Sequence, residues 1–215
     1  YTAFFLGAQS VCPSATMMVE FIGSWGDPTM EANAAQDLID KGAVLISQHS
    51  DSTTPATTAQ KNGVYHVGYN LDMRDVAQDA SIVSSRIDWT NYMVYVIETI
   101  VNGGKVEQDY KQHGYADGDV KLTDLNENVA AAGTADKLAD VEAALADGSL
   151  QVFDTSKFTV GGKELKSAFA LDTDGDFTPD KEEAVFDGAF HESYFQSAPY
   201  FAQRIDGITL LNEEY

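Results

Sequence analysis

The stretch Gly42-Ala-Val-Leu-Ile-Ser-Gln-His-Ser-Asp-Ser-Thr53 decides the fold that we expect for this chain. Its short apolar run, 43–46, contains β-branched residues and lies between a glycine and a polar cluster, which is typical of a fully buried strand of a parallel sheet. Pro55 then suits the first turn of a new helix, with a hydroxyl residue at 52–54 as its cap. Ligands of open α/β sheets bind beyond the carboxyl ends of the strands, so we expect the polar loop 49–53 to contact a ligand.

The same alternation of strand, polar loop and helix extends on both sides of this stretch. Asp27 and Pro28 form a helix start, and Gly42 is a helix stop. Strands that alternate with helices at this spacing predict an α/β fold with a doubly wound parallel sheet. The expected elements are strands at 17–23, 43–46, 64–69 and 80–85, and helices at 1–11, 28–41, 55–61 and 88–102.

The pattern becomes less regular beyond Gly104. No element is predicted over 167–199, which is acidic and aromatic with little periodicity. The remaining expectations are a short strand at 121–123, a helix at 134–146, a hairpin of 152–153 with 158–160, and a final strand within 200–212.

Composition narrows the classes of partner. The chain has 215 residues and a formal net charge of −21, which disfavours nucleic acid and polyanionic ligands such as nucleotides. Cys12 is the single cysteine, so neither an intrachain disulfide nor a Cys/His metal cluster is expected. No run of residues approaches the ~20 apolar residues that span a bilayer.

Candidate ligand contacts lie where predicted strands end. Both tryptophans of the chain, Trp25 and Trp89, occur at such places. A tryptophan is more often a core residue than a ligand platform, but Trp25 has only serine, glycine and aspartate around it, which favours a platform for a flat ligand. Asp51 and Asp72 can each accept two hydrogen bonds from adjacent hydroxyls, as a ribose or another sugar diol requires; the alternative for each is a turn former.

No catalytic arrangement is evident in the sequence. His49 has no nucleophile, paired acid or metal partner at a defensible spacing, so we expect a hydrogen-bonding histidine and no enzyme. Glycine-rich phosphate-binding motifs are absent from the sequence. The residues that we expect to contact the ligand are Trp25, His49, Asp51, Ser52, Tyr69, Asn70, Asp72 and Trp89.

The acidic stretch 172–183 has the first, third, fifth and twelfth ligand positions of a calcium-binding loop, ending at Glu183. Its glycine, Gly175, stands at the fourth position instead of the sixth. We therefore expect a solvated acidic turn, no metal site and no cofactor, with calcium binding as the alternative.

Five stretches carry a resemblance to a known family, and they are specific in this order and spacing: Ala-Phe-Phe-Leu-Gly-Ala-Gln-Ser-Val (3–11), Ser-Trp-Gly-Asp-Pro (24–28), Leu-Ile-Asp-Lys-Gly-Ala (38–43), Gln-His-Ser-Asp-Ser (48–52) and Gly-Val-Tyr-His-Val-Gly-Tyr-Asn-Leu-Asp-Met (63–73). On these stretches the chain resembles the basic membrane protein (BMP) family of substrate-binding lipoproteins, which serve ABC transporters.

The resemblance implies a type I periplasmic-binding-protein fold, in which two α/β lobes enclose a ligand cleft. It implies that the ligand is a purine nucleoside or a purine base. Trp25 would stack on the base, Asp72 would bind the ribose, and the loop 49–52 would line the cleft.

The resemblance also implies that this chain is mainly the second lobe, and that the first lobe and the lipid anchor lie outside it. The implied protein is extracytoplasmic, membrane-anchored through a lipid, and delivers its ligand to a transporter permease. Two alternatives stay open: a ligand-sensing domain of a signalling receptor with the same fold, and a sugar-binding protein. The implied parts are 1–84, a ligand-binding lobe; 85–117, a helix and crossover towards the first lobe; 118–165, a return to the lobe; and 166–215, a C-terminal segment.

Overall fold

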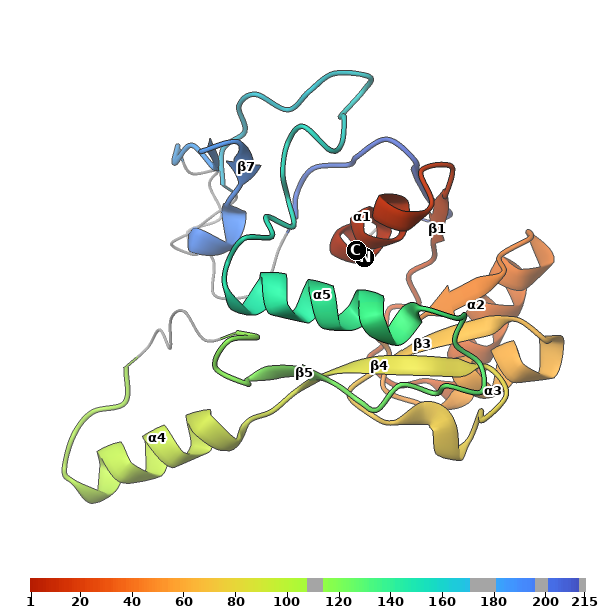
Figure 1. Ribbon diagram of the computed structural model, residues 1–215, viewed down its shortest axis with the longest axis horizontal. Helices are drawn as coiled ribbons and strands as arrows, with labels where there is room; N and C mark the ends of the chain where they lie inside the picture. Colours follow the sequence, from red (N-terminus) through yellow and green to blue (C-terminus); the bar gives the residue numbers. More distant parts are fainter. Residues whose placement is uncertain (108–113, 171–180, 196–200, 213–215) are drawn as a thin grey trace. The chain divides into compact units, whose positions relative to one another are not determined.

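The computed structural model describes residues 1–107, 114–170, 181–195 and 201–212, and the chain forms two compact units (Figure 1). The first unit combines residues 1–19 with 150–211, and the second contains 20–149 and Asn212. The expected boundaries at 84/85 and 117/118 both fall inside the second unit. The first residues of the 85–117 segment, Ser85 to Ile87, belong to the strand Ser81–Ile87 and pair with the strand Val120–Leu122 of the same unit.

A four-stranded sheet forms the centre of the second unit, in the order β2-β3-β4-β5 (Figure 1). The first three strands run parallel, and β5 pairs antiparallel with β4. The expected α/β fold with a mainly parallel sheet is therefore confirmed. The strands are β2 (Leu45–Ser47), β3 (Tyr65–Tyr69), β4 (Ser81–Ile87) and β5 (Val120–Leu122).

Two helices, α2 (Pro28–Asp40) and α3 (Thr54–Asn62), pack against each other and against β2 and β3. Asp27 caps α2 by accepting hydrogen bonds from two backbone N–H groups of the first turn, as its sequence predicts. Gly63 ends α3 in the left-handed conformation, at φ +69°. The helices contribute the small side chains of Ala35 and Ala59 to a buried cluster with Ile46 of β2.

Two expectations about strands are wrong. In β2 only Ile46 is buried, and Val44 just before it is 74 % exposed, because β2 pairs on one side only and is an edge strand of the described sheet. The strand expected at 17–23 is short: β1 (Met17–Val19) belongs to the first unit and pairs with β8 (Ile208–Leu210) instead of joining the four-stranded sheet.

The first unit is built on an aromatic core around α1 (Thr2–Val11). The hairpin expected within 152–160 is wrong, since Val160 bridges to Lys163 and Asp154 bridges to Ala189. The other elements of this unit are β6 (Val185–Phe186), β7 (Ala189–Phe190) and the short helix η2 (Glu192–Tyr194). The core residues are Phe5, Leu6, Phe158, Leu165, Ala170, Ala184, Phe190 and Ile205.

The remaining helices of the second unit are η1 (Met73–Asp75), α4 (Thr90–Val101) and α5 (Thr134–Ala146). Figure 1 shows α4 continuing from the end of β4, away from α2 and α3. None of the residues of α4 is buried, although its sequence is largely apolar. Within the described ranges, no helix combines the length and the apolar character that crossing a bilayer requires.

Candidate functional site

The sheet brings most of the predicted contact residues to one edge. The strands β2, β3 and β4 are parallel neighbours, so the loops after them begin at the same edge of the sheet. The rings of His49 and Tyr69, which follow β2 and end β3, lie 5.1 Å apart. Trp89 follows β4 and is 56 % exposed, with its ring 5.9 Å from that of Tyr92.

Trp25 does not follow a strand of this sheet, yet hydrogen bonds attach its loop to the loop after β2. The Asp51 backbone N–H donates to the carbonyl oxygen of Trp25 at 2.7 Å. The Glu31 carboxylate, on α2 and only 2 % exposed, bridges the same two loops. One oxygen accepts from the Asp27 N–H at 3.0 Å, and the other accepts from Ser52 Oγ at 2.6 Å.

The two joined loops, 24–27 and 49–53, therefore have a fixed backbone and exposed side chains. Trp25 is 80 % exposed, and His49 and Asp51 are also exposed. Ser52 is different, because its hydroxyl is used within the protein: it donates to Glu31 and accepts from the Thr54 N–H at 3.2 Å. An exposed indole and an exposed carboxylate on two hydrogen-bonded loops are suited to bind a flat molecule that carries hydroxyl groups.

Asp72 is engaged by Arg74. One Asp72 oxygen accepts from the Arg74 backbone N–H at 3.0 Å, and both oxygens accept from Arg74 Nε at 2.9 Å. Arg74 Nη2 makes a further contact with the second oxygen and also reaches Asp124 Oδ2, at 3.3 Å. Hydrogen bonds from Arg74 lower the pKa of Asp72. Three N–H groups of Arg74 thus engage the carboxylate, which has about four acceptor sites, so the arginine competes with a ribose for Asp72.

Asn70 is a turn residue at this edge of the sheet. Its φ of +59° lies in the left-handed region, which asparagine tolerates better than most residues. Its N–H donates to Ser85 O at 2.6 Å, and its Oδ1 accepts from the Ile87 N–H at 3.2 Å. These contacts fix the end of β3 against β4.

Sequence reasoning missed two buried residues behind the loop after β2. Gln48, 6 % exposed, uses its side-chain amide Nε2 to donate to Ser50 O and Ser52 O, both at 2.8 Å. Its Oε1 lies 2.9 Å from Nε2 of His66, which is fully buried in β3. A polar residue at the buried position of a predicted strand, such as His66, was the available signal for this contact.

Burial also determines the charge of His66. Loss of solvation lowers the pKa of this histidine from 6.5 to about 4, so the imidazole is neutral at pH 7. Both hydrogens of Gln48 Nε2 point to carbonyl oxygens, which leaves Oε1 as an acceptor towards His66. His66 therefore carries its proton on Nε2 and none on Nδ1.

We expect the free energy of unfolding to fall as the pH is lowered from 6.5 to about 4. The folded state keeps His66 neutral over this range while the unfolded chain takes up a proton, so the contribution is complete above pH 6.5 and is lost below it. The pKa difference corresponds to roughly 3 kcal/mol. Denaturant unfolding at several pH values should show a shallower pH dependence for His66→Gln than for the unchanged protein; equal slopes would contradict the assignment.

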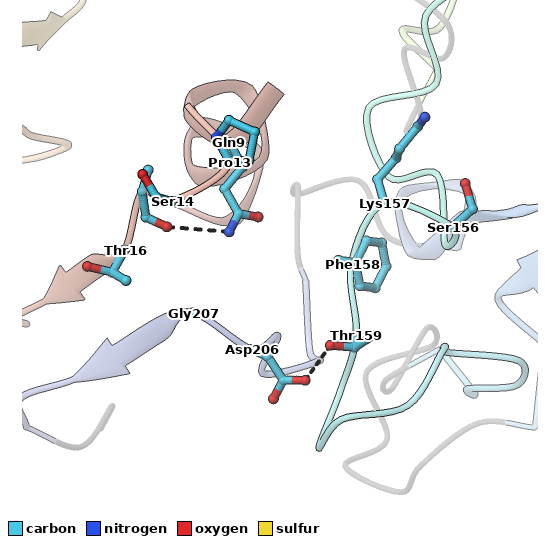
Figure 2. Close-up of a pocket in the computed structure, with 11 residues that line it drawn as sticks. Gln9, Pro13, Ser14, Thr16, Ser156, Lys157, Phe158, Thr159, Asp206 and Gly207 are labelled. Carbon is cyan, nitrogen blue, oxygen red and sulfur yellow. Dashed lines mark hydrogen bonds between the residues drawn. The ribbon is translucent and has the colours of Figure 1, made fainter. Parts of the chain in front are cut away.

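A separate cavity of about 460 Å³ lies in the first unit, near the end of α1. Figure 2 shows Ser14 and Thr16 on one side of it and Ser156 and Lys157 on the other. Asp206 at its floor accepts hydrogen bonds from Thr159 Oγ1 and the Gly162 N–H, which lower its pKa. None of the residues predicted to contact the ligand lines this cavity.

The described residues contain no group of three or more His, Cys, Asp or Glu side chains that could hold a metal ion. Most of the acidic stretch 172–183 lies outside the described residues, so calcium binding there stays untested. Glu183, its last member, accepts hydrogen bonds from Ser167 Oγ and from the Ala168 and Val185 N–H groups. Those bonds lower the pKa of Glu183.

Comparison with known proteins identifies relatives of the chain. A purine-binding protein of Brucella abortus is 37 % identical over 101 residues, which are 47 % of this chain and 29 % of that protein. A protein of Haloferax volcanii named as an ABC transporter glucose-binding protein, TsgA13, is 32 % identical over 156 residues, 73 % of this chain and 39 % of that protein.

A solved structure shares the fold. The solute-binding protein of an ABC transporter system from Conexibacter woesei superposes with a TM-score of 0.51 at 20 % identity, over 67 % of this chain and 48 % of that one. The chain thus spans less than half the length of each of these three proteins. The profile of the Bmp family, described as ABC transporter substrate-binding protein PnrA-like, matches residues 1–149. The chain belongs to this family of substrate-binding proteins, which are not enzymes.

Proposed function

We propose that the whole protein is the solute-binding component of an ABC transporter and that its ligand is a purine nucleoside or purine base. The exposed indole of Trp25 is the observation that carries the proposal. Its loop is joined to the neighbouring loop through Asp51 N and the Glu31 carboxylate, and the indole, 80 % exposed, is accessible to a flat ring. The purine-binding name of the Brucella abortus relative supports this ligand class.

Within this proposal, Asp51 is the better placed carboxylate for ribose hydroxyls. It is exposed and lies next to the Trp25 loop, through the hydrogen bond from its N–H to Trp25 O. Asp72, the residue implied by the family resemblance, already binds Arg74 through both oxygens. Arg74 competes for the Asp72 oxygens, so we assign the first hydroxyl contact to Asp51 and keep Asp72 as a second candidate.

The charge of the chain favours an uncharged purine over a nucleotide. The formal net charge is −21, and the sequence contains no glycine-rich phosphate-binding motif. The exposed edge near Trp25 also holds Asp51, whose negative charge would repel a phosphate. A nucleoside or a base offers the flat ring without that penalty.

The proposed partners follow from the family. The protein would deliver its ligand to the permease of an ABC transporter, outside the cytoplasm and attached to the membrane through a lipid anchor. We propose no interaction with nucleic acid, because the same negative charge opposes binding to phosphate backbones.

A calorimetric panel on the complete gene product tests the ligand class. Adenosine, guanosine, inosine and their bases should bind, while ribose and glucose should not compete at the same concentration. The complete protein is required, since this chain spans less than half of its relatives. Failure of every purine to bind at millimolar concentration would contradict the proposal.

Sugar binding is the second candidate, favoured by the name of the Haloferax volcanii relative, which matches more of this chain than the purine-binding relative does. An exposed tryptophan beside a carboxylate also suits a sugar ring with its hydroxyls. In the same panel, glucose or ribose binding without purine binding would establish this alternative.

A further inference from the structure

We propose that Gln48 and His66 are positioning residues of the ligand site: together they hold the backbone of 50–52 in the conformation that presents Asp51 beside Trp25. This inference rests on the proposed function, because it assigns a role within the same site. Neither residue is among those expected to touch the ligand, since both side chains are buried.

The Gln48 side chain is placed to fix the loop from within. It is 6 % exposed and follows β2 directly. Its amide nitrogen donates one hydrogen to Ser50 O and the other to Ser52 O, both at 2.8 Å. The two carbonyl oxygens flank Asp51, so the residue that we assign to the ligand has its backbone fixed on both sides.

His66 fixes the orientation of Gln48 in turn. An amide side chain can rotate to exchange its oxygen and nitrogen, and only the hydrogen bonds at both ends select one orientation. His66 Nε2, 2.9 Å from Gln48 Oε1, donates to it and so leaves the amide nitrogen directed at the loop. His66 is fully buried in β3, which pairs with a strand on each side, so this donor is anchored in the sheet.

The contact across the two loops depends on this arrangement. With 50–52 held, the Asp51 N–H reaches Trp25 O at 2.7 Å. Even a short shift of the loop would break this bond, because hydrogen bonds weaken steeply with distance and angle. We infer a continuous connection from a buried histidine in the sheet to the backbone of Trp25.

Amide hydrogen exchange of the complete protein tests the loop without any ligand. In Gln48→Met the Asp51 amide should exchange at least about tenfold faster, because the loop loses two hydrogen bonds. The amide of Asn70, which follows β3 and is bonded to Ser85 O of β4, should keep its rate. Gln36→Met is a matched control, since Gln36 donates to Asp40 on the exposed side of α2 at 2.8 Å.

Affinity supplies the second readout. Gln48→Met and His66→Leu should weaken binding of the best purine from the panel about tenfold at a temperature where both variants are folded. His66→Gln, which retains a donor near the position of Nε2, should bind within about threefold of the unchanged protein. A structural role alone would lower the melting temperature of all three variants and leave the affinity of the folded fraction unchanged.

The outcomes separate this inference from the proposed function. If no purine binds but the Asp51 amide exchanges faster in Gln48→Met, the positioning role of Gln48 is supported and the proposed ligand class is wrong. If Asp51 exchange and purine affinity are both unchanged in Gln48→Met, the positioning is wrong. Should the variants fail to fold, nitrogen NMR of the unchanged protein decides: protonation of His66 on Nε2 at pH 7 supports the connection, and protonation on Nδ1 overturns it.

Discussion

Replacing Phe5 with alanine should destabilise the first unit by about 3–5 kcal/mol, the usual cost of removing a buried phenylalanine. Phe5 lies on α1 and is 1 % exposed, within the core of that unit. Its ring packs against the backbone of Gly207: a Cβ placed there would lie 2.6 Å from Phe5 Cζ.

Denaturant unfolding of the complete protein measures this effect. Phe4→Ala is the matched control, because Phe4 is the neighbouring residue of the same helix and is only half-buried. The Phe5 variant should show an earlier transition, and the Phe4 variant a clearly smaller change. Equal losses in both variants would contradict the packing described for α1.

Replacing Trp25 with alanine should weaken purine binding about 5- to 150-fold, since stacking of one base on an aromatic side chain contributes ~1–3 kcal/mol. Base and nucleoside should lose affinity alike, because the indole would contact only the ring. Stability should change by less than about 0.5 kcal/mol, as Trp25 is 80 % exposed. Calorimetry with adenosine and adenine measures the loss, and thermal unfolding checks the fold.

Matched variants sharpen this prediction. Trp89→Ala removes the other tryptophan, also exposed, and should have a smaller effect. Asp51→Asn should weaken the binding of nucleosides and leave the binding of free bases nearly unaffected. Asp72→Asn should mainly weaken the ion pair with Arg74. Unchanged purine affinity in Trp25→Ala would refute the stacking assignment. If Asp72→Asn weakened nucleoside binding more than Asp51→Asn does, the ribose contact would belong to Asp72 instead.

Local signals in the sequence predicted the helices and most strands well. Asp27 with Pro28 begins α2, and Gly63 ends α3, because a cap, a fixed φ and a left-handed residue act over a few residues. Strand partners are determined by long-range packing instead. The pairing of β1 with β8 joins segments near opposite ends of the chain, and no local pattern indicates it. The expected hairpin near 152–160 failed for the same reason, since Asp154 pairs with Ala189.

For the candidate site, too, local signals and long-range contacts differ in how far the sequence predicts them. The loops after β2, β3 and β4 share one edge, because parallel strands present their carboxyl ends together, and their contact with a ligand stays a prediction. The contact from Asp51 to Trp25 could not be predicted, as Trp25 lies outside the strands of that sheet. The pairing of Asp72 with Arg74 spans two residues and could have been weighed from the sequence. The hydrogen bond between Gln48 and His66 depends on the register of β2 and β3.

A crystal structure of the complete protein with adenosine bound tests the central claim most directly. We predict the purine ring parallel to the indole of Trp25, with their atoms about 3.5–4 Å apart, and the ribose hydroxyls within hydrogen-bond distance of a carboxylate of the same edge. Adenosine bound without contact to Trp25 would contradict the account.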